Sequence, residues 1–120
     1  MTRAPQLLQA IRVISGVVFV VFGAGKFVNH PSELASFRGY GLPAPEVFVI
    51  VIGVIELVGG VLLIVNRFVT PAALVLAADM VGAIVVSGIA KGEWISLTLA
   101  PALLLAMVAV LRGQASGRER

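Results

Sequence analysis

Four charged side chains lie inside otherwise apolar stretches of this sequence: Arg12, Lys26, Glu56 and Asp79. The two cations belong to the first apolar stretch, and the two acids lie near the centres of the next two. A charge at such a position is costly in hydrocarbon unless it is paired, neutralised or turned toward a protein interior. These residues therefore predict a buried charge network, whose role as ion pair, proton site or ligand contact the sequence leaves open.

Several kinds of chemistry are excluded by residue type. The chain has no cysteine and a single histidine, His30, which is predicted to be a solvated residue of a connecting segment. Thiolate metal sites, iron–sulfur clusters and bis-histidine haem therefore cannot form within it. We predict no catalytic residue and no metal ligand, and we do not expect an autonomous enzyme. A quinone bound between helices, with Arg12 or Lys26 as donor, is the cofactor that these residues allow.

The composition indicates which elements position these charges. Of the 120 residues, 59% are hydrophobic and only 12% are charged, with a mean hydropathy of +1.07. Soluble domains have about 45–50% apolar and about 25% charged residues. We therefore predict an all-α, integral membrane four-helix bundle, a single domain over residues 1–111, followed by a polar, disordered tail at 112–120. The predicted spans are residues 7–27, 47–65, 70–90 and 94–111.

Two connections have different lengths and different consequences. The four residues 66–69 form a turn so short that the helices on either side must be antiparallel neighbours. The longer segment 29–44 contains Pro31–Phe37, which has a proline at its first position and Leu34 and Phe37 three residues apart. This segment predicts a short helix at the outer membrane interface, and an ordered loop is an equally open alternative.

The basic residues predict the orientation. With a cytoplasmic N-terminus, six basic residues face the cytoplasm and three, Lys26, Arg38 and Lys91, face outward. The excess favours N-in, C-in. The six are Arg3, Arg12, Arg67, Arg112, Arg118 and Arg120. Because these residues are scattered at segment ends rather than gathered in a patch, the pI near 10.2 does not indicate nucleic-acid binding.

Depth and side-chain direction predict two ion pairs. Glu56 and Asp79 are each about twelve residues from the turn between their helices, or roughly 17 Å at helical rise. Side chains lean toward the N-terminus of their own helix. With a cytoplasmic N-terminus, Lys26 and Glu56 therefore lean toward each other, whereas Arg12 and Asp79 both lean toward the cytoplasm. We predict the pairs Lys26–Glu56 and Arg12–Asp79. Snorkelling of Arg12 and Lys26 to lipid phosphates is the alternative.

Small residues mark the faces on which these helices approach one another. Gly16 and Gly23 share the face of the first helix that carries both cations, and Gly53 and Gly60 share the face of the second that carries Glu56. Together with Gly59, they are predicted to be helix-packing contacts, because glycine lets neighbouring backbones come close in a membrane.

The residues of the first half to two thirds of the chain resemble the pattern of the DoxX family. That pattern consists of Arg12, Gly16, Phe19, Gly23, Lys26, Phe27, Phe37, Gly41, Leu42, Pro43, Gly53, Glu56, Gly59 and Gly60. The resemblance implies a small, multi-pass protein of the bacterial inner membrane. The family takes its name from the membrane subunit of a thiosulfate:quinone oxidoreductase, and a mycobacterial relative is associated with a membrane complex containing superoxide dismutase and a sulfurtransferase.

These observations lead to one main functional prediction and two alternatives. We predict an accessory or scaffold subunit of a membrane-associated, quinone-linked redox system, with Glu56 and Asp79 handling protons. The alternatives are a small proton-coupled transporter, for which midplane acids are typical, and a purely structural assembly factor. The expected partners are membrane lipid, redox enzymes and further copies of the chain, with no nucleic acid.

Overall fold

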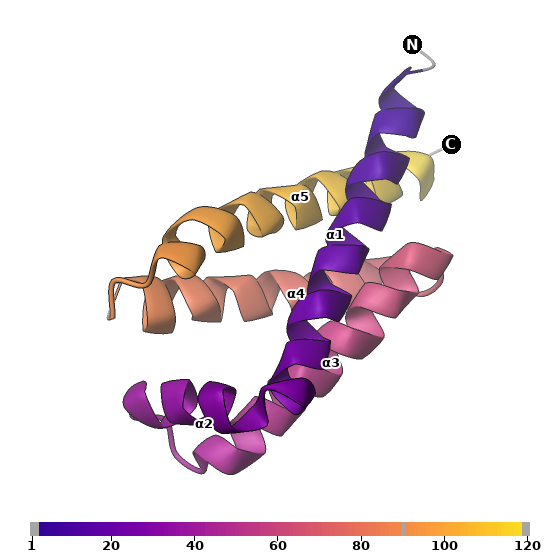
Figure 1. Cartoon of the computed structure of the whole chain (residues 1–120). Coiled ribbons are helices and arrows are strands. Elements are labelled where there is room, and N and C mark those ends of the chain that lie inside the picture. The colour runs from indigo at the N-terminus through magenta and orange to yellow at the C-terminus, as the bar shows by residue number, and fades with distance from the viewer. Residues whose placement is uncertain (1–2, 90, 119–120) are drawn as a thin grey trace.

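The computed structural model describes residues 3–89 and 91–118, and these residues form helices joined by short turns (Figure 1). Four helical segments are long and apolar enough to cross a membrane. The prediction of an all-α bundle with four spans is confirmed. The elements are α1 (Arg3–Val28), α2 (His30–Gly39), α3 (Pro45–Val65), α4 (Val69–Ala83), the π-helical segment η1 (Ile84–Ile89) and α5 (Trp94–Arg118).

The boundaries of α3 and α4 follow from local chemistry. Pro45 begins α3, where its missing N–H leaves no intrahelical bond unmade. Asn66 ends it in the left-handed conformation (φ 61°), with its backbone N–H donating to the carbonyl of Leu62. Asparagine tolerates this conformation better than most residues do. Phe68 is also left-handed (φ 50°), so the chain reverses within three residues and the predicted antiparallel turn is present.

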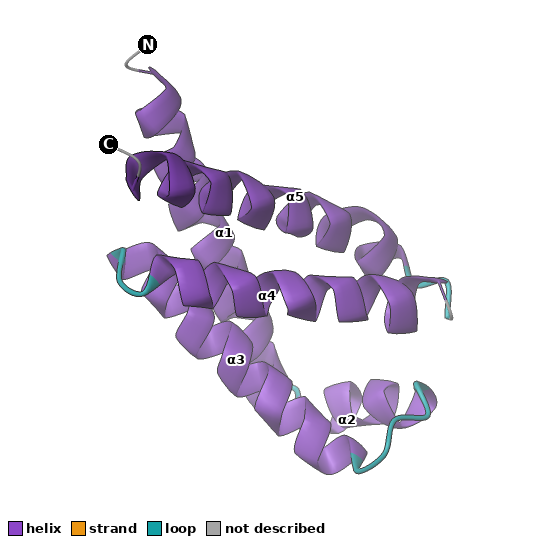
Figure 2. Cartoon of the chain, turned by 180° about the vertical axis from the view of Figure 1, so that it is seen from behind, coloured by secondary structure: helices purple, strands orange, loops and turns teal. Residues whose placement is uncertain are grey.

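The helices pack as two pairs joined at the α3–α4 turn. α1 lies along α3, and α4 lies along α5, while α3 and α4 diverge away from the turn that links them (Figures 1 and 2). The most deeply buried side chains include Phe19 of α1, Leu63 of α3, Leu76 of α4 and Met107 of α5. The common core therefore lies toward the end of the molecule that holds the turn and both termini (Figure 1).

The segment between the first two spans is helical, which settles one of the two alternatives. α2 extends the predicted helix by one residue at its start and two at its end. Phe37 is buried and its ring stacks at a tilt on that of Tyr40, with centroids 5.4 Å apart. His30 is the first residue of α2 and half-buried, with Nδ1 3.3 Å from the carbonyl oxygen of Lys26, so it is not the solvated loop residue expected.

Three further boundaries differ from the sequence-based prediction. α1 begins at Arg3 rather than at residue 7. The predicted disordered tail is wrong over residues 112–118, where α5 continues to Arg118 and Gly113 faces the side chain of Leu8 on α1. The third span ends in the π-helical turns of η1, which the sequence analysis did not predict. The predicted last residue of that span, Ala90, lies outside the described residues.

Candidate functional site

The candidate site is built around an ion pair buried between the first two spanning helices. Lys26 Nζ on α1 lies 2.9 Å from Glu56 Oε1 on α3, a hydrogen-bonded salt bridge. The side chains are only 12% and 4% exposed. The predicted Lys26–Glu56 pair is therefore confirmed as a contact.

Close approach of the two backbones brings this pair together. A Cβ added to Gly23 would lie 2.6 Å from the backbone nitrogen of Leu57 and 2.8 Å from the carbonyl oxygen of Gly53. One added to Gly53 would meet the side chains of Lys26 and Phe27. The predicted packing glycines thus lie at the helix contact that flanks the ion pair.

The same kind of contact recurs nearer the turn. A Cβ added to Gly16 would lie 2.7 Å from the carbonyl oxygen of Gly60, and one added to Gly60 would lie 2.6 Å from that of Gly16. Gly59 faces the other way, toward Leu76 of α4. α3 therefore uses one glycine face for α1 and a separate glycine for α4.

The third member of the cluster is Asp79 of α4. Its carboxyl group interacts with that of Glu56 and lies within electrostatic reach of Lys26. Its Oδ2 atom is buried, and no donor among the described residues reaches it. Two carboxyl groups can hydrogen-bond to each other only when one of them carries a proton. Lys26, Glu56 and Asp79, hereafter the buried cluster, thus gather two carboxyl groups and one amino group between α1, α3 and α4.

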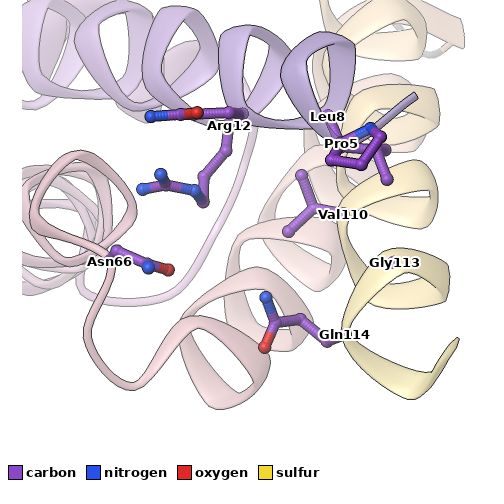
Figure 3. A pocket seen from close by; sticks show the side chains of 8 residues that line it. Pro5, Leu8, Arg12, Asn66, Val110, Gly113 and Gln114 are labelled. Carbon is purple, nitrogen blue, oxygen red and sulfur yellow. The ribbon is translucent and has the colours of Figure 1, made fainter. Parts of the chain in front are cut away.

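The predicted pair between Arg12 and Asp79 is wrong. Arg12 Nη1 donates instead to the carbonyl oxygens of Leu63 and Ile64 in the last turn of α3. The last carbonyl groups of a helix have no partner within the helix and attract cations. Arg12 therefore neutralises the end of α3, far along the helix from Glu56, and borders a separate cavity (Figure 3).

The structure adds polar residues that the sequence analysis did not select. Glu33 of α2 lies 3.9 Å from Lys26 Nζ and is 36% exposed, so it links the buried cluster to the α2 side of the molecule. Glu33 follows Lys26 by seven residues, but only the turn between α1 and α2 brings the two together. In one continuous helix this spacing would place the two side chains on the same face but about 10 Å apart along the axis, so the sequence alone does not predict the contact.

On the α2 side of the molecule, a second set of polar side chains connects the α1–α3 pair of helices to the α4–α5 pair. The hydroxyl of Tyr40 donates to Glu93 Oε1 at 2.8 Å, and the hydroxyl of Ser87 in η1 donates to the same oxygen. Burial raises the pKa of Tyr40, the hydrogen bond with Ser87 lowers it, and the hydrogen bond to Glu93 raises it again. This outer contact, Tyr40, Ser87 and Glu93, connects the segment after α2 to the start of α5.

Comparison with known proteins shows which family this chain belongs to. The DoxX family model matches residues 7–89, which include most of α1, all of α2 to η1 and every member of the buried cluster. The chain belongs to the DoxX family. It is therefore a membrane protein of that family with four membrane-spanning candidate helices.

Three curated relatives of this DoxX chain are bacterial. An uncharacterized membrane protein of Mycobacterium tuberculosis is 38% identical over 87 residues, 71% of this chain and 53% of the relative. An uncharacterized protein of Haemophilus influenzae is 32% identical over 63% of this chain and 54% of its own length. The Bacillus subtilis protein named "Putative oxidoreductase CatD" is 35% identical over 62% of this chain and 54% of its own length.

The chain spans about half the length of the curated relatives it matches. No solved structure matches the chain. The similarity to these relatives therefore supports membership of the family and does not assign an activity.

Proposed function

We propose that this protein is an accessory subunit of a quinone-linked redox system in a bacterial inner membrane. The observation that carries the proposal is the buried cluster, an acid pair with a lysine inside the spanning helices. The name of the similar Bacillus subtilis protein is that of an oxidoreductase, which supports a redox setting. The other two similar proteins are also bacterial, which supports a bacterial inner membrane as the location.

The subunit's role would be to take up and release protons. Glu33, partly exposed, exchanges protons with water, and its contact with Lys26 brings them to the buried cluster. Transfer of one proton from the Lys26 ammonium to the carboxylate of Glu56 leaves a neutral amine and a neutral acid. The amine then regains a proton from the Glu33 side, and Glu56 passes its proton on to the neighbouring Asp79, which would release it toward the quinone. Reduction of a quinone consumes protons, so such a path would serve it.

The electrons for quinone reduction would not be carried by this chain. The sequence contains no cysteine, and among the residues that the structure describes no three metal-binding side chains gather. An enzyme partner or the quinone itself would have to carry them. The protein would then act by helix contact within the membrane, alone or as an oligomer.

The test is purification of the full chain in mild detergent, with mass spectrometry of retained proteins and extraction of quinone. We expect a redox enzyme and quinone to be retained by the wild type and by Asp79→Asn. In the purified assembly, Asp79→Asn should slow quinone reduction without releasing the partner. Turnover by the isolated chain, or retention of no redox enzyme, would overturn the proposal.

A small proton-coupled transporter is the second candidate, favoured by the carboxyl pair within two adjacent spans. Flux of protons or of a co-transported solute through the pure protein in liposomes would support this candidate against the first. A purely structural assembly factor is the third. Normal quinone reduction with the Asp79→Asn subunit would favour it.

A further inference from the structure

A polar cavity lies at the opposite end of the molecule from the outer contact. It has a volume of about 360 Å³ and is bounded by the start of α1, the α3–α4 turn and the end of α5 (Figure 3). Both termini lie at this end (Figure 1). Its polar lining residues are Gln9, Arg12, Asn66 and Gln114, and its apolar ones include Leu8 and Val110.

The polar lining consists of one cation and three amides, with no acidic side chain among the residues that border the cavity. Arg12 uses Nη1 for the carbonyl groups of α3, while its Nε and Nη2 make no hydrogen bond to any described residue. The side-chain amides of Asn66 and Gln114 also make none within that part of the chain. In Figure 3 these side chains extend toward the space between the helices.

The depth of the cavity follows from its neighbours. Arg12 bonds to the last turn of α3, and Asn66 begins the turn between two spans that end at Val65 and resume at Val69. The second span ends and the third begins beside the cavity, which places its polar lining at the edge of the hydrocarbon layer, next to the headgroup phosphates. Leu8 and Val110 give the same cavity an apolar portion suited to the glycerol and upper acyl region.

We propose that this cavity binds the phosphate group of an anionic phospholipid from the leaflet on the side of both termini. The free guanidinium nitrogens of Arg12 donate to the phosphate oxygens, a geometry for which arginine is well suited. The amides of Asn66 and Gln114 complete the set of donors. The bound lipid would close the space between α1 and α5, and this inference does not depend on the redox proposal.

Native mass spectrometry of the full chain, titrated with phosphatidylglycerol or phosphatidylcholine, tests the proposal. We expect one retained phosphatidylglycerol and weaker retention of phosphatidylcholine. Arg12→Gln should weaken phosphatidylglycerol binding about tenfold, the change that corresponds to one charge-assisted hydrogen bond. Arg38→Gln is the matched control, since it removes the same charge from an exposed side chain on α2, away from the cavity.

Because Arg12 also supports the end of α3, its loss is paired with a milder variant. Gln114→Leu keeps that support and should weaken binding about fivefold, the change expected for a neutral hydrogen bond. Unchanged affinity in Gln114→Leu and Arg12→Gln would overturn the site, as would an equal loss in Arg38→Gln. Inorganic phosphate that competes as tightly as phosphatidylglycerol would identify a free-phosphate site and overturn the lipid.

Discussion

Lys26 and Glu56 form their salt bridge with little access to water, and this decides how the pair behaves when one partner is lost. Each charge has given up hydration, so loss of one partner leaves the other buried. Glu56 without Lys26 has only the carboxyl group of Asp79 beside it, and Lys26 without Glu56 keeps only the longer contact with the partly exposed Glu33. The exposed pair Arg38–Glu46, at 3.4 Å, has side chains 60% and 61% exposed and stays hydrated when broken. The two pairs thus offer a matched comparison within one protein.

A double-mutant cycle on Lys26 and Glu56 should show strong coupling. We expect Lys26→Met to lower the free energy of unfolding by about 3–5 kcal/mol, because it leaves the buried Glu56 without a cation. Glu56→Gln should cost less, because Lys26 keeps its contact with Glu33. The double variant should recover part of this loss. Thermal unfolding in detergent, followed by circular dichroism, measures the four free energies.

The control cycle uses Arg38→Gln and Glu46→Gln. Its single variants should each change the free energy of unfolding far less than the buried ones do, and coupling should be small, because solvent screens both charges. Strictly additive effects at Lys26 and Glu56 would show that the buried contact contributes no coupling energy.

Tyr40 is the only tyrosine of the chain, so its titration can be followed directly. We expect the phenolate absorbance to rise with a midpoint above 10, because burial and the Glu93 contact disfavour the anion. Glu93→Gln should move the midpoint down. Since the pKa is raised in the folded state, the stabilisation is complete below pH 10 and is lost as pH rises through the raised value.

The titration of Tyr40 has a simple internal reference. In the unfolded protein, the hydroxyl of Tyr40 should titrate near its ordinary pKa of 10.0. A folded midpoint at or below that value would mean that the hydroxyl is hydrated and that the outer contact does not persist in solution.

At the scale of elements, the α1–α3 contact depends on glycines that leave no room for a side chain. Gly23→Ala should lower the free energy of unfolding by about 1–3 kcal/mol, because its Cβ would meet backbone atoms of α3. Gly25→Ala on the same helix is the control, because a Cβ there meets nothing within 4 Å. Alanine's higher helix propensity should make this control neutral or stabilising by up to about 1 kcal/mol.

Thermal unfolding of the two alanine variants separates packing from propensity. A Gly23→Ala protein as stable as Gly25→Ala would show that the helices separate without loss and that their close approach is not needed for the fold.

The helices and the Lys26–Glu56 pair were predictable because hydropathy, depth and side-chain direction all point the same way. The partner of Arg12 was not predictable in this way. Pairing each buried cation with a buried acid overlooks the helix-end carbonyl groups of Leu63 and Ile64, which lie at the depth of Arg12. Glu56 and Asp79 lie at equal depth from the turn, which places them beside each other.

Other parts of the site depend on tertiary structure. The π-helical turn of η1 directs Ser87 to Glu93, and a π-helical turn has no distinct sequence pattern. The helical end of α5 was missed because a polar composition says little about a segment that packs against α1.

At the scale of the whole molecule, the two ends differ in chemistry. The α2 end carries Glu33 and the outer contact and leads to the buried cluster, while the end with both termini carries Arg12 and its cavity. The two helix pairs diverge toward the α2 end, where the hydrogen bond from Tyr40 to Glu93 connects them (Figure 2). In the proposed function, protons would therefore reach the buried cluster from the α2 end, and their source depends on how the chain sits in the membrane.

The final prediction concerns that orientation. The six-to-three excess of basic residues predicts that the end with both termini faces the cytoplasm and that α2 faces outward. Because the chain has no cysteine, single replacements report location without background. Ser32→Cys on exposed α2 should react with a membrane-impermeant maleimide in intact spheroplasts, and Ala115→Cys near the end of α5 should react only after permeabilisation. The reverse labelling pattern would mean that the protein has the opposite orientation in the membrane. In that orientation Glu33 would take up protons from the cytoplasm. Labelling of both sites from one side would contradict the arrangement in which α2 and the termini lie at opposite ends of the four spans.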